Sequence, residues 1–196
     1  MEQELLKNNF ERHGFKTSFF DTKKAASDYL KDQISGKKVA IGGSVTAQEM
    51  GLYEALSEKN EVIWHWKKAG RETLMEARSA EVYITSANGV SKTGELVNID
   101  GTGNRVAALI YGPETVIILT GMNKVAANVE EALSRIHNVA TPQNCIRLNK
   151  KTPCSTTGTC ADCLSPDCIC NQVVITRRSG IKGRIKVLLI GDTFGY

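Results

Sequence analysis

Short apolar runs of strand length alternate with helical segments from Lys37 onward, and this alternation is the strongest constraint on the fold. The expected strands cover residues 39–41, 62–66, 82–84 and 116–119, and a helix covers residues 127–137. Parallel strands that are covered on both faces read as short apolar runs, and parallel neighbours need crossover segments between them. The sequence therefore predicts an α/β fold with a mostly parallel sheet flanked by helices.

The two ends of the chain differ from this middle part. Residues 1–36 read as a helical lead-in, in which Ala26, Leu30 and Ile34 recur at four-residue spacing. Residues 149–171 read as a cysteine-rich loop, and two further strands are expected at 172–176 and 184–190, within the C-terminal segment 172–196. A length of 196 residues suits a single domain, residues 1–196, with the loop anchored at both ends.

Charge and hydropathy exclude several classes of protein. A formal charge of +4 is only mildly basic and gives no reason to expect nucleic-acid binding. No apolar stretch approaches the roughly 18 residues of a membrane helix. The first residues are acidic and lack the basic start and apolar run of a signal peptide. We therefore expect a cytoplasmic protein without a membrane or nucleic-acid partner.

Five of the six cysteines lie close together in the chain. Their spacing is Cys154-x5-Cys160-x2-Cys163-x4-Cys168-x-Cys170. In a reducing compartment, such a group indicates metal or redox chemistry rather than a disulfide framework. Soft thiolates suit an iron–sulfur cluster or tetrahedral zinc, and redox-active or free thiols are a third reading. Cys145 lies outside this group, and we expect it to be a buried packing residue.

A glycine loop, Gly42-Gly43-Ser44 followed by Thr46, joins the end of an expected strand to the start of a helix. Backbone N–H groups at such a position favour an anion, and Ser44 can cap the helix. The glycine fingerprint of dinucleotide-binding folds and the lysine of a P-loop are both absent. Ligand binding and a purely structural turn are therefore equally good interpretations of this loop.

A second polar run, residues 93–105, alternates glycines with functional side chains. Dense polar groups near strand ends of an α/β sheet are typical of a ligand crevice. A carboxylate and a guanidinium there can serve acid–base chemistry or hold an anion, whereas the alternative is a polar turn whose carboxylates cap N–H groups. Asn123 and Lys124 follow the strand at 116–119 and add a cation to the same edge if the strands are parallel. The polar residues of the run are Glu95, Asn98, Asp100, Asn104 and Arg105.

Taken together, these residues resemble the lactate-utilization (LUD) domain family. The similarity runs through the glycine loop, Asn98-Ile-Asp-Gly-Thr-Gly-Asn-Arg105, Gly121-Met-Asn-Lys124 and the cysteine loop. It implies a Rossmann-like domain related to CoA transferases and ribose-phosphate isomerases, and a place in bacterial lactate metabolism beside iron–sulfur subunits. Stand-alone members carry four cysteines, which fall here on Cys154, Cys160, Cys163 and Cys170. Cys168 departs from that pattern, so the fourth ligand is open between Cys168 and Cys170, with Cys170 as our choice.

Three hypotheses about function follow. The first is a [4Fe–4S] protein of lactate or related 2-hydroxy-acid metabolism, with the cluster beside a small-anion pocket. It would bind a small anionic or carboxylate substrate, work with an iron–sulfur or flavin redox partner, and could be a homodimer. Its expected catalytic residues are Glu95, Arg105 and Lys124, and its expected ligand-binding residues are Gly42, Gly43, Ser44, Thr46, Asn98, Asp100, Asn104 and Asn123.

The second hypothesis is a non-redox transferase, isomerase or lyase. It would use Glu95 as base or nucleophile, and the cysteine loop would hold a structural metal such as zinc. The third is a noncatalytic regulator or assembly partner that carries the cluster. The metal content of the purified protein separates the first hypothesis from a zinc-bearing form of the second.

Overall fold

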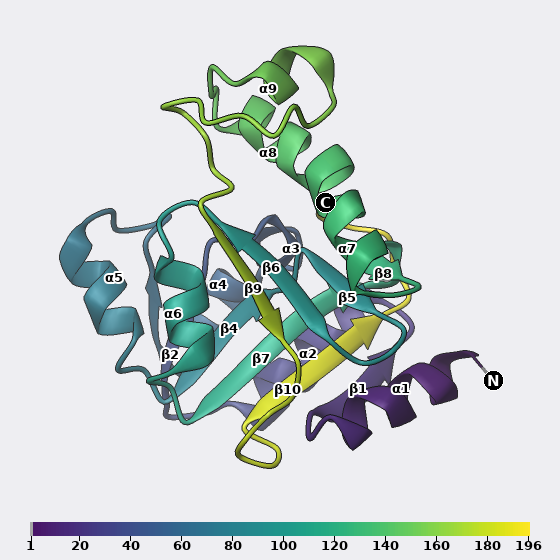
Figure 1. Ribbon diagram of the computed structural model, residues 1–196. Coiled ribbons are helices and arrows are strands. Elements are labelled where there is room, and N and C mark those ends of the chain that lie inside the picture. The colour runs from purple at the N-terminus through teal and green to yellow at the C-terminus, as the bar shows by residue number, and fades with distance from the viewer. Residues whose placement is uncertain (1) are drawn as a thin grey trace.

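The computed structural model describes residues 2–196, and a six-stranded parallel sheet lies at its centre (Figure 1). Every neighbouring pair in this sheet is parallel, which confirms the prediction from the apolar runs. In spatial order the strands are β1 (Lys16–Phe20), β10 (Ile185–Ile190), β7 (Thr115–Gly121), β4 (Val82–Ser86), β2 (Lys38–Ile41) and β3 (Glu61–Trp64).

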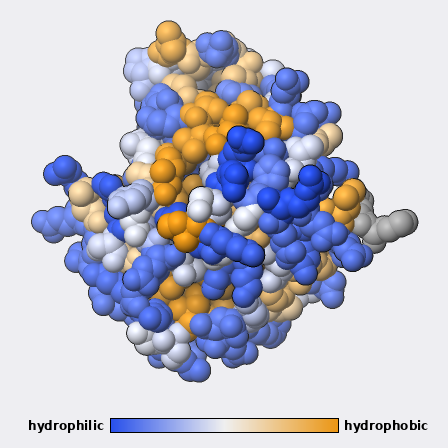
Figure 2. Space-filling view, turned by 60° about the horizontal axis from the view of Figure 1, so that its bottom comes forward, coloured by the Kyte–Doolittle hydropathy of each residue, from blue (hydrophilic) through white to orange (hydrophobic). Residues whose placement is uncertain are grey.

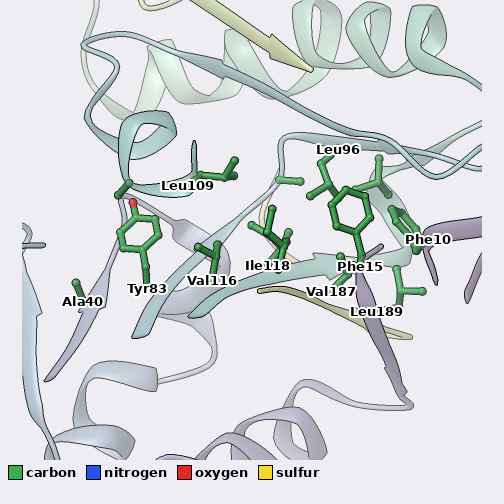
Figure 3. Close-up of a cluster of buried hydrophobic side chains, with 14 of the residues drawn as sticks. Phe10, Phe15, Ala40, Tyr83, Leu96, Leu109, Val116, Ile118, Val187 and Leu189 are labelled. Atoms are coloured by element: carbon green, nitrogen blue, oxygen red, sulfur yellow. The ribbon is translucent and has the colours of Figure 1, made fainter. Parts of the chain in front are cut away.

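Side chains alternate between the two faces of this sheet, and each face has its own hydrophobic core. In β7, Val116 and Ile118 join one core, whereas Ile117 and Leu119 join the other. The first core, drawn in Figure 3, also receives Phe10 from α1 and Leu109 from α6. Helices α2, α3 and α4 cover the opposite face. These helices and α5 span Glu2–Arg12 (α1), Lys23–Gln33 (α2), Val45–Glu49 (α3), Leu52–Ser57 (α4), Arg71–Ala77 (α5) and Asn104–Ile110 (α6).

A second, four-stranded sheet packs over the first core. Its order is β8 (Val125–Ala126), β5 (Gly89–Ser91), β6 (Leu96–Asp100) and β9 (Gln172–Thr176), with β5 and β9 antiparallel to β6. A short 3-10 turn, η1 (Met122–Lys124), connects β7 to β8. The chain then forms α7 (Val129–Arg135), a π-helical turn η2 (Ile136–Ala140) and α8 (Thr141–Arg147). The sequence predicted neither this second sheet nor the extension of the helix beyond residue 137.

The cysteine segment lies at the far end of α8, where it projects from the two sheets (Figure 1). It contains a short helix, α9 (Pro153–Thr157), so the expectation of a continuous loop over 149–171 is wrong there. The helical lead-in over 1–36 needs a larger correction. Its two helices are present, but β1 lies between them and pairs in parallel with β10 along its whole length.

Exposed apolar side chains line a groove of about 740 Å³ beside β9, an edge strand of the second sheet. Figure 2, which turns the bottom of the molecule forward, shows apolar patches among the hydrophilic surface. Ile110, Tyr111, Ile175 and Ile181 are exposed at this groove. The expected homodimer stays a prediction. Among residues 2–196, no helix has the length and apolar character needed to span a membrane.

Candidate functional site

The glycine loop and Lys124 meet at the carboxyl edge of the parallel sheet, as the sequence predicted for parallel strands. Ser44 follows β2 and Lys124 follows β7. The Nζ atom of Lys124 donates a hydrogen bond to Thr46 Oγ1 over 2.7 Å. The hydroxyl of Ser44 donates to Ser86 Oγ at the end of β4 (3.0 Å) and accepts from the backbone N–H of Ala47, which caps α3. Ligands of open α/β sheets bind at such strand ends, where the loops of neighbouring strands diverge.

Position 42 requires glycine because the backbone there lies very close to side chains of β4. A Cβ atom at this position would lie 2.3 Å from the Tyr83 hydroxyl and 2.9 Å from Thr85 Oγ1. Tyr83 is 2% exposed and cannot easily move aside. At least the first glycine of the loop is therefore explained by packing, which supports the structural interpretation of that residue.

Lys124 is a buried amine in a small polar cavity. Its side chain is 1% exposed, and it lines a cavity of about 50 Å³ together with Ser44, Thr46, Ser86, Asn88 and Arg147. Burial, and then the positive charges of Arg135 and Arg105, lower its pKa from 10.5 to about 7, against the opposing influence of Glu49. A substantial fraction of this amine is therefore neutral near pH 7.

Arg105 lies in the wall of the same cavity, but the protein itself uses its donors. One terminal nitrogen donates to the Ser86 carbonyl and to Asn98 Oδ1, both over 2.9 Å. The other donates to Asn88 Oδ1 (2.7 Å) and to the Ile99 carbonyl (2.8 Å). The guanidinium thus ties the end of β4 to β6. We assign it a positioning role in place of the substrate contact that the sequence suggested.

Asp100, Asn104 and Asn123 also have partners within the protein. Asp100 lies 3.6 Å from Arg105 Nε and accepts hydrogen bonds from the N–H groups of Gly103 and Val106 at the start of α6. Asn104 Oδ1 accepts from Thr102 Oγ1 (2.5 Å), and Asn123 Nδ2 donates to the Gly195 carbonyl (3.5 Å). Asn98 and Asp100 therefore hold the wall of the site, which corresponds to the alternative interpretation of the polar run.

Glu95 lies at the other end of β6 from Asp100, because it precedes the strand that Asp100 completes. Its Oε2 accepts hydrogen bonds from Thr93 Oγ1 (2.5 Å) and Ser91 Oγ within the β5–β6 turn. Partial burial raises its pKa, but the hydrogen bonds from Ser91 and Thr93, the charge of His13 and a backbone hydrogen bond together outweigh burial and lower the pKa overall. Glu95 does not line the cavity of Lys124. The structure does not bring it together with the other predicted catalytic residues.

A larger cleft of about 350 Å³ adjoins the Lys124 cavity, and both are lined by Gly43, Trp66, Arg105 and Arg147. The Arg147 guanidinium lies over the Trp66 ring, with Cζ 4.9 Å from the ring centroid, and donates two hydrogen bonds to Asn144 Oδ1. His65 and Lys150 also line the cleft. Burial lowers the pKa of His65, against the opposing charge of Asp100.

The sequence did not predict His65, Trp66, Arg147 or Lys150 as candidate site residues, yet all four line this cleft. The expected strand at 62–66 included His65 and Trp66. In the structure β3 ends at Trp64, so these two side chains follow the strand at the same carboxyl edge as the glycine loop. A strand boundary at Trp64 would have placed His65 and Trp66 at this edge, whereas it has no bearing on Arg147 and Lys150.

All six cysteines line one cavity of about 430 Å³. Cys145 Sγ lies 3.8 Å from Cys154 Sγ, and Cys160 Sγ lies 3.4 Å from His137 Nδ1. Cys170 packs against α7 and η2, where burial raises the pKa of its thiol to about 12. Within residues 2–196, no three His, Cys, Asp or Glu side chains are close enough together to form a ready ligand set for one ion. Cys145 is buried as expected, but it also belongs to the wall of the cysteine cavity.

The cysteine cavity adjoins the cleft of His65 and Arg147. Both are lined by Cys168, Ile169 and Asn171. Asn171 anchors this boundary, because its N–H donates to the Asp100 carbonyl (3.0 Å) and its Nδ2 to the Gly101 carbonyl (2.8 Å). The cysteine segment is therefore held against the polar turn that begins α6.

The chain is similar to known proteins in family and in fold. The model of the LUD domain family matches residues 3–190. A search of the curated proteins found no match. Among solved structures, a DUF162 family protein from Deinococcus radiodurans superimposes with a TM-score of 0.57 at 13% identity, over 97% of this chain and 96% of the other. Ribose 5-phosphate isomerase A from Neisseria gonorrhoeae gives a TM-score of 0.37 at 18% identity, over 55% of this chain and 54% of the other.

Proposed function

Since the chain belongs to the LUD domain family, we propose that it acts in the metabolism of lactate or a related small 2-hydroxy acid, with an iron–sulfur cluster held by its cysteine segment. The observation that carries this proposal is the common boundary of the cysteine cavity and the polar cleft at Cys168, Ile169 and Asn171. A cluster in the first cavity would lie next to a substrate in the second. The chain would then exchange electrons with an iron–sulfur or flavin partner.

The cysteine cavity fits an iron–sulfur cluster by the chemistry of its donors. Four thiols, those of Cys160, Cys163, Cys168 and Cys170, are half-buried on irregular chain, and Cys154 is buried beside them. We assign the ligands to Cys154, Cys160, Cys163 and Cys170. When bound, a [4Fe–4S] cluster supplies one-electron transfer. A structural zinc site is the alternative that uses the same thiolates.

The polar cleft fits a small carboxylate. Arg147 and Lys150 provide two positive charges, and the Arg147 guanidinium is held by its position over the Trp66 ring and by its hydrogen bonds to Asn144 Oδ1. A planar guanidinium binds a carboxylate through two parallel hydrogen bonds. His65 is neutral near pH 7 because burial lowers its pKa, so one ring nitrogen can accept the proton of a substrate hydroxyl. The site can therefore hold a 2-hydroxy acid by its carboxylate and take up its hydroxyl proton.

The alternative in which Glu95 is a base or nucleophile has no support from this geometry. Its carboxylate is occupied by Ser91 and Thr93, in a turn at the far end of β6 from Asp100. The third hypothesis, a noncatalytic protein that carries the cluster for regulation, stays a prediction. The experiment below separates it from the metabolic proposal.

The test is anaerobic purification or reconstitution of the full chain, followed by visible spectroscopy and titration with lactate and pyruvate. We expect a brown protein whose spectrum changes when either acid is added. A Cys160→Ser variant should lose iron, whereas Cys145→Ser, the matched control at the wall of the same cavity, should keep it. A cluster that assembles but is insensitive to both acids, with neither acid bound, would favour the regulator.

A further inference from the structure

Lys124 is a nucleophilic group that the cluster-based proposal does not use. It is 1% exposed, and none of the ion pairs formed among residues 2–196 involves it. Its hydrogen bond is to a neutral hydroxyl, Thr46 Oγ1. A buried lysine without a carboxylate partner carries a desolvation penalty in its charged form. Such a residue is expected to have a function that compensates for this penalty.

The charged groups around Lys124 favour its neutral form. Arg105 from α6 and Arg135 from α7 act on it as like charges, and Arg147 from α8 lines the same cavity. Glu49 from α3 is the opposing charge, and it does not outweigh burial and the arginines. A desolvated lysine next to other cations is an activated amine, as in enzymes that form Schiff bases with carbonyl substrates.

The cavity limits which carbonyl compound can reach this amine. Its volume of about 50 Å³ holds a molecule of only a few heavy atoms, since one water needs about 10–15 Å³ on the same measure. Side chains that carry N–H donors line it, namely Asn88, Asn144 and Arg147. A small 2-oxo acid satisfies both requirements, because its carbonyl carbon is directly attached to a carboxylate.

We propose that Lys124 captures the carbonyl carbon of a small 2-oxo acid and forms an imine with it. The lone pair of Nζ forms the new C–N bond, and the carbonyl π electrons move to oxygen, which takes a proton. Loss of this oxygen as water then gives the C=N bond, and both protons that leave Nζ end on that water. Thr46 Oγ1, 2.7 Å from Nζ, is placed to relay one of them. The choice of a 2-oxo acid rests on the proposed function, whereas the amine chemistry does not depend on the cysteine segment.

The test is reductive trapping on the full-length chain. The protein is incubated with pyruvate and sodium cyanoborohydride near pH 7, and adducts are mapped by intact mass and peptide analysis. Among the lysines, we expect the adduct on Lys124 alone. About half of an amine with a pKa near 7 is neutral at that pH, against less than about 0.1% for an ordinary lysine, so the neutral fraction of Lys124 exceeds that of surface lysines by roughly a thousandfold and labelling should concentrate on Lys124.

Variants and a second probe make the outcome decisive. Lys124→Arg should abolish the adduct, and the matched control Lys59→Arg, at an exposed lysine, should retain it. In the wild-type chain, labelling should rise as the pH increases through about 7, a result that needs no variant to fold. Labelling spread over many lysines, or unchanged by Lys124→Arg, would overturn the proposal. Equal labelling by acetone, a ketone that lacks a carboxylate, would overturn the assignment of the substrate class.

The two proposals fail separately. A protein that contains iron but forms no adduct would keep the cluster and exclude the imine. A trapped adduct on a protein without iron would support the imine and exclude the cluster.

Discussion

Replacing Lys124 by methionine should stabilise the protein at neutral pH and remove a specific pH dependence. In the folded chain the pKa of Lys124 is about 7, whereas 10.5 is its ordinary value in the unfolded chain. Between these values the unfolded chain binds more protons than the folded one, so the wild-type stability falls as the pH drops from about 10.5 to 7 and then levels off. At about 1.4 kcal/mol for each factor of ten in proton affinity, the total loss is about 5 kcal/mol.

Methionine fills a similar volume and carries no charge, so the variant does not lose stability through protonation at this position. It leaves the Thr46 hydroxyl without its partner, which costs about 1 kcal/mol at every pH. The free energy of unfolding should therefore exceed that of the wild type at pH 7. The difference in free energy of unfolding between the variant and the wild type should increase by about 3 kcal/mol when the pH is lowered from about 9.5 to 7.

Urea denaturation of both proteins at these two pH values, with the same cofactor content, measures this difference directly. Parallel stability curves for the two proteins would refute the reasoning. Lys124 would then not be a desolvated amine, and the imine proposal would lose its nucleophile.

Three further substitutions test the wall of the site, the glycine loop and the cleft. Arg105→Gln should lower the free energy of unfolding by about 3–5 kcal/mol in urea denaturation, because it disrupts a buried network around Asp100; a loss below about 1 kcal/mol would contradict the positioning role. Gly42→Ala should cost about 1–3 kcal/mol through its clash with Tyr83, and Tyr83→Phe should recover part of that loss. Arg147→Lys should weaken pyruvate binding about tenfold in calorimetry while the urea midpoint stays unchanged, and unaltered affinity would remove Arg147 from the carboxylate site.

The central sheet could be predicted from the sequence because its middle strands are apolar on both faces. Residues 39–41, 82–84 and 116–119 are buried between two layers and therefore stand out from their polar surroundings. β1 escaped detection because Lys16, Thr17 and Ser18 dilute its pattern. Its partner β10 lies at the other end of the chain, and only the folded structure shows that pairing.

The candidate site was predictable to the extent that it follows from parallel strands. Strand ends at one edge of a parallel sheet meet there, which brings Ser44 and Lys124 together. Glu95 was grouped with them because the polar run was read as part of the same sheet. In the structure β6 belongs to a second sheet and pairs antiparallel with β5, so its two ends separate Glu95 from Asp100.

The sequence does not reveal which polar side chains already have hydrogen-bond partners within the protein. Arg105 has the residue type of an anion-binding group, yet four of its donor contacts go to β4, β6 and the loop that contains Asn88. Cys145 shows the opposite case. Its isolated position in the sequence suggested packing alone, but the π-helical turn and α8 place it at the cysteine cavity, beside Cys154.

Metal analysis of protein purified without oxygen tests the central claim most directly. If Cys154, Cys160, Cys163 and Cys170 hold a [4Fe–4S] cluster, the full chain should be brown and contain about four irons and four sulfides per molecule. Colourless protein with one zinc and no acid-labile sulfide would contradict the account and leave the cysteine segment as a structural metal site.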